Sequence, residues 1–182
     1  MSELETQMIS AACEGKPEGY RYLMSRYGRS VQLLVGQMVE DDRDVEELTQ
    51  DVFVRAFKYL ADFDPARASF STWLSRIAHN AALNHLRSHG YAPLPLREEQ
   101  YTQHELQLPI PDSAGILSET DRLAQLDDAI DRLRPEERSL LHLRYYEGRT
   151  LGEIAEVMDV PTGPLASRLQ RIRQKLKRIM DN

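Results

Sequence analysis

Basic side chains gather near the end of the sequence, in a pattern that could bind nucleic acid. Every charged residue between positions 164 and 180 is basic; these are Arg168, Arg171, Arg173, Lys175, Lys177 and Arg178. At about 100° per residue of an α-helix, the apolar residues of this segment fall on one stripe: Leu165, Leu169, Ile172, Leu176 and Ile179. Ser167, Gln170 and Arg171 lie roughly opposite that stripe. Arginine and glutamine can pair with base edges in the major groove, whereas lysine suits phosphate. A solvated amphipathic helix is the alternative.

The residues just before this segment predict the elements that would position it. Thr150 followed by Glu153 is a capping-box pattern, which predicts a short helix ending near Met158. Residues 159–161 then predict a turn before the long basic helix. A short helix, a tight turn and a longer basic helix make a helix-turn-helix. Upstream, the sequence predicts helices over about 121–133 and 135–147, the second with Pro135 in its first turn.

The first ninety residues predict four more helices, near 5–14, 18–39, 44–60 and 70–89. The helix over 44–60 has an apolar face typical of a packed core: Val45, Leu48, Val52, Ala56 and Leu60. A second face carries Glu47, Gln50, Asp51, Val54 and Lys58. A valine among polar groups, opposite a buried face, indicates a surface for a partner protein. A solvated face with one ordinary exposed valine is the other interpretation.

The next segment combines side chains that could hold unpaired bases. Residues 62–69 predict a loop, and residues 70–89 predict a helix with Phe70 and Trp73 near its start. Aromatic rings, amides and basic groups together can bind single-stranded nucleic acid. Phe70 and Trp73 also fit the spacing of core residues, so the polar side chains are the better functional candidates.

Composition limits the remaining possibilities. The chain has 182 residues and a formal net charge of −6, so its basic segment stands out against an acidic remainder. We find no apolar run long enough for a membrane span and no secretory signal. The single cysteine, Cys13, excludes an internal disulfide and favours a reducing cytoplasm; it is expected to be a buried small residue. The sequence predicts an all-α fold with helical domains at 1–90 and 120–182 and a flexible, proline-rich, acidic linker at 91–119.

The motifs resemble the sigma-70 family, in its minimal extracytoplasmic-function (ECF) group. The segments 133–148, 151–158, 160–163 and 167–171 are similar to region four, a helix-turn-helix that binds the −35 promoter element and packs on the flap of the polymerase beta subunit. The resemblance implies −35 contacts at Ser167, Arg168, Gln170 and Arg171, and we add Arg173, Lys175 and Lys177 as phosphate-binding candidates. Ala166 and Pro164 depart from the usual pattern, so the promoter sequence does not carry over.

The N-terminal motifs resemble region two of the same family. Residues 44–57 are similar to the helix that docks on the beta-prime clamp helices, which implies contacts to core RNA polymerase from Glu47, Gln50, Asp51 and Val54. Residues 70–87 are similar to the segment that melts the −10 element and binds its non-template strand. The preceding loop, residues 63–69, is similar to the one that accepts a flipped −10 base. The −10 candidates are Phe63, Arg67, Ser69, Trp73, Arg76, His79, Asn80, Asn84 and Arg87. His79 and Asn84 depart from the usual residues. The family also implies an anti-sigma factor as partner.

Other functions find less support in the residues. His85 and His89 are spaced as metal ligands on a helix but lack a third ligand, so we expect no metal and no cofactor. No catalytic arrangement stands out, and we expect no enzymatic activity. A helix-turn-helix regulator that acts without polymerase would need a ligand pocket or receiver in its first part. A helical enzyme with an incidental basic helix is the other alternative.

Overall fold

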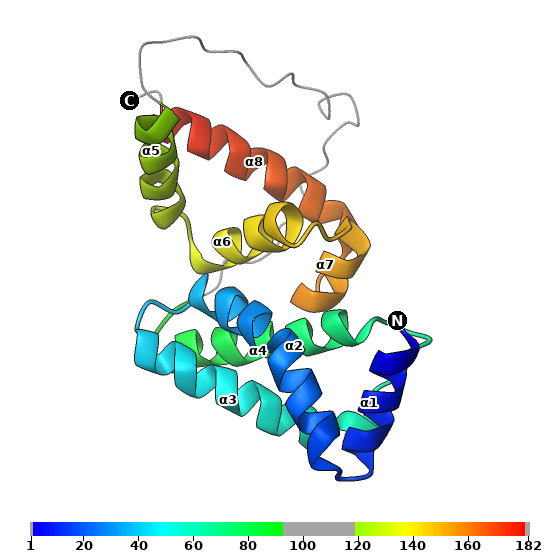
Figure 1. Cartoon of the computed structure of the whole chain (residues 1–182). Helices are drawn as coiled ribbons and strands as arrows, with labels where there is room; N and C mark the ends of the chain where they lie inside the picture. Colours follow the sequence, from blue (N-terminus) through cyan, green and yellow to red (C-terminus); the bar gives the residue numbers. More distant parts are fainter. Residues whose placement is uncertain (1, 93–118, 181–182) are drawn as a thin grey trace.

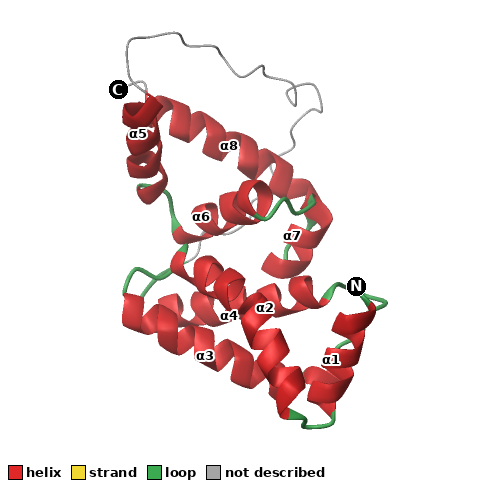
Figure 2. Cartoon of the chain, in the orientation of Figure 1, coloured by secondary structure: helices red, strands yellow, loops and turns green. Residues whose placement is uncertain are grey.

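The computed structural model describes residues 2–92 and 119–180, with side chains from residue 123 onward in the second range. Within these residues the chain forms helices and connecting turns, and it contains no strand, which confirms the predicted all-α fold (Figures 1 and 2). The helices form two domains, and most of the predicted linker at 91–119 lies outside the described residues. None of the described helices is both long and apolar enough to cross a membrane.

The N-terminal domain contains α1 (Glu3–Cys13), α2 (Pro17–Gly36), α3 (Asp42–Lys58) and α4 (Phe70–Ser88), with a short 3-10 helix at Leu60–Asp62. Both α3 and α4 begin at side-chain caps: Asp41 accepts hydrogen bonds from the amides of Arg43 and Asp44, and Ser69 accepts one from the amide of Thr72. The apolar faces of α2, α3 and α4 meet in a core that includes Leu23, Leu34, Val52, Phe70 and Leu74, each at most 1% exposed.

The α1–α2 pair shows why Cys13 is not buried as predicted. Helix α1 turns Ile9 and Ala12 toward the core, at 8% and 2% exposure. Cys13 follows one residue later, about 100° around the helix, and is exposed. The two helices approach closely at Gly19, where an added Cβ would lie 2.4 Å from the backbone nitrogen of Ala12.

The C-terminal domain contains α5 (Glu119–Asp131), α6 (Pro135–Leu141), α7 (Leu151–Met158) and α8 (Thr162–Met180). The helix predicted over 135–147 is present, but its last turn is a π-helix at His142–Tyr146 instead of an α-helix. There the amide of Glu147 donates to the carbonyl of His142 across the wider turn, at 3.0 Å. Gly148 follows at a φ of 67°, a conformation that glycine adopts without steric cost, and it redirects the chain toward α7.

Helices α7 and α8 form the predicted helix-turn-helix. The predicted capping box is present: the Thr150 side chain accepts from the amide of Glu153, whose carboxylate accepts from the amide of Thr150. Asp159 ends α7 in the left-handed conformation, with a φ of 56°. The α8 stripe packs on this motif through Leu165, Leu169, Ile172 and Leu176, all buried as predicted.

The two domains pack against each other. Figure 1 shows the C-terminal domain above α2 and α4, with α7 nearest one end of α4. Helices α4 and α7 are in contact, and a hydrogen bond joins His79 of α4 to Ser139 of α6. This arrangement of the domains was not predicted from the sequence.

Candidate polymerase and nucleic-acid interfaces

The four predicted polymerase-binding residues lie on one exposed face of α3. Glu47, Gln50, Asp51 and Val54 are all exposed, and Val54 retains 66% of its surface. On the opposite face of the helix, Val52 and Ala56 are fully buried. A helix anchored through one face can present the other as a fixed surface, and an exposed valine gives this surface apolar area to bury.

A shallow apolar pocket of about 270 Å³ lies beside this face, between α2 and α3. Its lining includes Met24, Gly28, Phe53 and Gln50, so it adjoins the predicted polymerase-binding residues. Met24 is itself 48% exposed, although it is a large apolar side chain. The pocket and Met24 extend the candidate protein-binding surface from α3 onto α2, which the sequence pattern of α3 alone did not indicate.

The loop before α4 places an aromatic cluster next to exposed polar groups. Phe63 meets Phe70 edge to face and Trp73 at a tilt, each with ring centroids 5.4 Å apart. Phe70 is 1% exposed, whereas Phe63 and Trp73 are half-buried. Phe70 is therefore a core residue, and the partly exposed faces of the other two rings can contact a ligand. Arg67 and Ser69 are exposed in the same loop.

The polar residues of α4 divide into accessible and covered groups. Arg76, Asn84 and Arg87 are exposed, and Asn80 is half-buried. His79 is only 2% exposed, and its Nδ1 lies 3.2 Å from the Oγ of Ser139 on α6. The sequence pattern placed His79 with the DNA-binding candidates, but in this conformation the other domain covers its ring.

The environment of His79 keeps its imidazole neutral. Burial lowers the pKa of His79 to about 4, and the positive charges of Arg168 on α8 and Arg87 on α4 act in the same direction. Arg168 is itself a −35 candidate, and it is half-buried. Arg168, a −35 candidate, thus affects the charge state of His79, a −10 candidate in the other domain.

The remaining −35 candidates lie along α8. Arg171 and Lys177 are exposed, whereas Ser167 and Gln170 are half-buried. Lys175 and Arg173 both have partners within the domain. The Nζ of Lys175 lies 2.8 Å from a Glu137 carboxylate oxygen, and the Nε of Arg173 donates to the hydroxyl of Tyr145 at 2.6 Å.

The Lys175–Glu137 contact joins α8 to the start of α6. Burial would raise the pKa of Glu137, but the hydrogen bond from Lys175 and another from the backbone of Arg134 outweigh it, so the pKa lies below its usual value. Any contact of Lys175 with phosphate therefore competes with Glu137.

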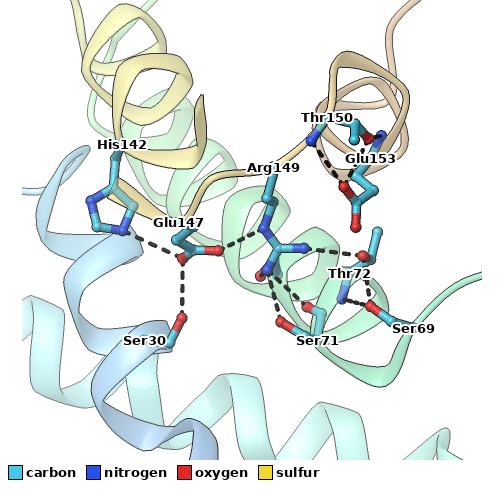
Figure 3. Close-up of polar contacts among 10 residues, drawn as sticks. Ser30, Ser69, Ser71, Thr72, His142, Glu147, Arg149, Thr150 and Glu153 are labelled. Atoms are coloured by element: carbon cyan, nitrogen blue, oxygen red, sulfur yellow. Dashed lines mark hydrogen bonds and ion pairs between the residues drawn. The ribbon is translucent and has the colours of Figure 1, made fainter. Parts of the chain in front are cut away.

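Polar contacts between the domains are the main feature that sequence reasoning missed. At one end, the Nε of Arg138 donates to the carbonyl of Gln37 at 2.7 Å, and its Nη2 lies 3.6 Å from Glu40. Near the α7 end, Arg76 pairs with Asp159 at 2.8 Å. The buried arginine Arg149 also contacts α4. In the sequence, the one indication of these contacts was a group of small polar residues at the start of α4. Their role cannot be inferred without knowing that Arg149 and α7 pack against them (Figure 3).

Comparison with known proteins identifies the family of both helical domains. The family model for sigma-70 region 2 matches residues 23–91, and that for sigma-70 region 4 matches residues 123–176. The RNA polymerase sigma-H factor of Pseudomonas aeruginosa is 28% identical over 185 residues, covering 98% of this chain and 94% of that protein. The ECF RNA polymerase sigma-E factor of Haemophilus influenzae is 29% identical over 177 residues, covering 93% and 92%.

Two solved structures share the fold. The structure of CnrH in complex with the cytosolic domain of CnrY aligns with a TM-score of 0.67 and 22% identity, over 97% of each chain. The sigma factor RpoE in complex with the anti-sigma factor NepR, from Bartonella quintana, aligns with a TM-score of 0.63 and 17% identity, over 89% of this chain and 96% of that one. The chain therefore belongs to the sigma-70 family, as an ECF sigma factor for transcription initiation by RNA polymerase.

Proposed function

We propose that this chain binds core RNA polymerase, recognises the −10 and −35 promoter elements and favours the opened strands. The domain at 1–90 would bind polymerase and the −10 element, the segment 91–119 would act as linker, and the domain at 120–182 would bind the −35 element and the beta flap. The observation that carries the proposal is the exposed α3 face with Val54 at its centre, present on a chain that also has a basic helix-turn-helix. Such a protein would work in the cytoplasm with its polymerase.

A gel-shift experiment tests this proposal against the alternatives. A purified duplex promoter should be bound tightly when chain and core polymerase are both present, and poorly by either one alone. Tight binding by the chain alone would indicate a regulator that acts without polymerase. No binding under any condition would contradict the proposal.

The exposed α3 face should carry much of the affinity for core polymerase. Replacing Gln50 and Asp51 together by alanine is expected to weaken core binding by about tenfold or more, because the few residues that dominate an interface lie near its centre and each costs more than about 1 kcal/mol when truncated. The measurement is equilibrium binding of labelled chain to purified core. Gln125→Ala with Asp128→Ala, an exposed pair on α5, is the matched control. Equal affinities of the two double variants for core polymerase would show that the exposed α3 face does not bind it.

The α4 helix and its preceding loop would hold the opened −10 strand. Candidates are the partly exposed rings of Phe63 and Trp73 for stacking, with Arg67, Ser69, Arg76, His79, Asn80, Asn84 and Arg87 for bases and phosphates. Strand opening requires no hydrolysis by this chain, because binding the open state more tightly than the duplex shifts the equilibrium. His79 would contribute only after the domains separate.

In the C-terminal domain, Arg171 should read a base while Lys177 holds phosphate. Both are exposed on α8, but Arg171 lies nearer the helix start, where helix-turn-helix proteins contact base edges. Arg171→Ala should weaken the free energy of promoter binding by about 1–3 kcal/mol and reduce the preference for one base at one promoter position. Lys177→Ala should weaken binding to all promoters alike. It should also reduce the slope of log affinity against log salt concentration by about one. Holoenzyme affinity across a library of −35 variants, at several salt concentrations, separates the two; uniform weakening by Arg171→Ala would make it another phosphate contact.

We also propose an anti-sigma factor as a partner of this chain. Support comes from the similar solved structure of RpoE, which contains the anti-sigma factor NepR. Affinity purification of the tagged chain from its native cells should recover an inhibitor protein under uninduced conditions. Constant full activity with no co-purifying inhibitor would contradict this proposal.

A further inference from the structure

A buried carboxylate lies between α1 and α2. Glu5 is 6% exposed, although glutamate is almost never fully buried unless its charge has a partner. The hydroxyl of Tyr27 on α2 donates a hydrogen bond to its Oε1. The Nε of Arg26 donates to the same hydroxyl at 3.3 Å and lies 4.0 Å from the same carboxylate oxygen. The three side chains form one polar cluster where α1 packs along α2 (Figure 1).

Tyr27 belongs to this polar cluster and also to the aromatic cluster of the N-terminal domain. Burial, and after it the hydrogen bond to Glu5, raise the pKa of Tyr27 to about 12, so the phenol keeps its proton and stays a donor. Its ring contacts that of Phe70, with centroids 5.3 Å apart and planes tilted by 57°. Because the tyrosine side chain is rigid apart from its two torsions, a hydrogen bond at its hydroxyl end restricts how its ring meets Phe70.

Phe70 connects Tyr27 to the loop before α4. Its ring meets Phe63 edge to face at 5.4 Å and Trp73 at 5.6 Å, spacings at which aromatic pairs attract each other beyond their buried area. Phe63 and Trp73 are the half-buried rings proposed to stack on an opened −10 base. Helix α1 also contacts the 3-10 helix at Leu60–Asp62, directly before Phe63. The contacts therefore run without a gap from Glu5 to this loop.

The chemistry of Glu5 differs from that of a residue that only packs one helix on another. An apolar side chain at this position would pack α1 on α2 without the cost of removing a carboxylate from water. Apolar contacts are non-directional, however, whereas a hydrogen bond weakens steeply away from its preferred angle. The buried carboxylate of Glu5 thus restricts the orientation of Tyr27, which apolar packing alone would not do.

We propose that Glu5 is a positioning residue for the −10 site: through Tyr27 and Phe70 it fixes how the loop presents its two rings, Phe63 and Trp73, to an unpaired base. The region 2 family model begins at residue 23, so Glu5 lies outside the segment that it matches. The consequence for DNA rests on the proposed function of the loop and α4. The effect on the rings does not, and it can be measured without DNA.

Fluorescence of the free chain measures the positioning. Trp73 is the one tryptophan in the sequence, so quenching by acrylamide reports the exposure of its ring. Glu5→Ala should raise the quenching constant while helicity is preserved, because Tyr27 loses its acceptor and the rings beyond it loosen. Glu5→Gln still accepts from the Tyr27 hydroxyl, so it should keep the quenching constant near the wild-type value.

A second variant and two controls separate positioning from stability. Tyr27→Phe keeps the ring but removes the hydroxyl, so it should raise quenching as Glu5→Ala does, and the double variant should exceed neither single variant. Val35→Ala truncates a buried residue about two turns along α2 from Tyr27. It should lower the urea midpoint without changing quenching. Glu3→Ala, at an exposed position of α1, should change neither.

Binding of holoenzyme to DNA measures the consequence for the −10 site. Holoenzyme assembled from each variant is mixed with a single-stranded DNA pool of random sequence, and the bound molecules are sequenced. Glu5→Ala and Tyr27→Phe should reduce the enrichment of preferred sequences about fivefold, the lower end of what stacking one base on an aromatic ring contributes. Val35→Ala affects stability alone, so it should leave the preference among sequences unchanged.

The outcomes distinguish the positioning role from the proposed function. Unchanged Trp73 quenching in both Glu5→Ala and Tyr27→Phe, or an equal rise in Val35→Ala, would overturn the positioning role and leave the proposed function untouched. Raised quenching with an unchanged sequence preference would overturn the role in the −10 site and count against the proposed function of the loop. Raised quenching with reduced preference, both restored in Glu5→Gln, is the expected result.

Discussion

Phe70→Ala is expected to destabilise the N-terminal domain by about 3–5 kcal/mol, the usual cost of truncating a buried phenylalanine. Phe70 is 1% exposed, and its ring contacts those of Tyr27, Phe63 and Trp73. Removing the ring leaves a cavity at the point where α2, α4 and the preceding loop meet. The loss would therefore also loosen the loop that carries the proposed −10 contacts.

Urea unfolding measures this effect. Helicity follows the whole chain, while fluorescence of Trp73, the one tryptophan in the sequence, follows the N-terminal domain. Tyr59→Ala is the control, because Tyr59 is 50% exposed and surface substitutions usually change stability by no more than about 0.5 kcal/mol. A loss below about 1 kcal/mol for Phe70→Ala would show that the ring is not a core residue.

The second large effect concerns pH. His79 has a pKa of about 4 in the closed conformation, in which the C-terminal domain packs on α4, because of burial and the nearby charges of Arg168 and Arg87; its ordinary value is 6.5. Its ring faces Ser139 of α6. Above the ordinary pKa the imidazole is neutral in both states, so the closed state has its full stability. As the pH falls from 6.5 toward 4, the exposed ring gains a proton that the buried ring resists, and stability is lost.

At a pH of about 5 the closed conformation should be weaker by about 2 kcal/mol than at neutral pH. The measurement is energy transfer between Cys13 and Gln174→Cys across this pH range. His79→Gln, which keeps a polar group beside Ser139, should flatten the response, whereas His89→Gln at an exposed position should not. If wild type and His79→Gln opened with the same pH dependence, His79 would not be the titrating group. Glu147 acts in the same direction at lower pH, because its pKa is also lowered in the closed state.

Local chemistry explains how much of the fold could be predicted. Capping residues, prolines and apolar periodicity are properties of neighbouring residues, so Thr150 with Glu153 indicated the start of α7 and the stripe from Leu165 to Leu176 indicated the buried face of α8. The polar face of α3 was also predictable, because a helix that buries Val52 must expose Gln50 and Val54. The same reasoning gave the extent of the helix over 135–147 but not the type of its last turn, which is a π-helix at His142–Tyr146.

The sequence by itself determined the helices, their buried faces and the family, because these depend on residue types at fixed short spacings. Only the tertiary structure decided how the two domains meet. Arg149 and Ser75 are 74 positions apart, and nothing local marks either as a partner of the other. In the sequence, Arg149 is one more basic residue and Ser71, Thr72 and Ser75 are ordinary helix residues. Packing α7 on α4 removes water from all of them, and their hydrogen bonds then become specific contacts between the domains.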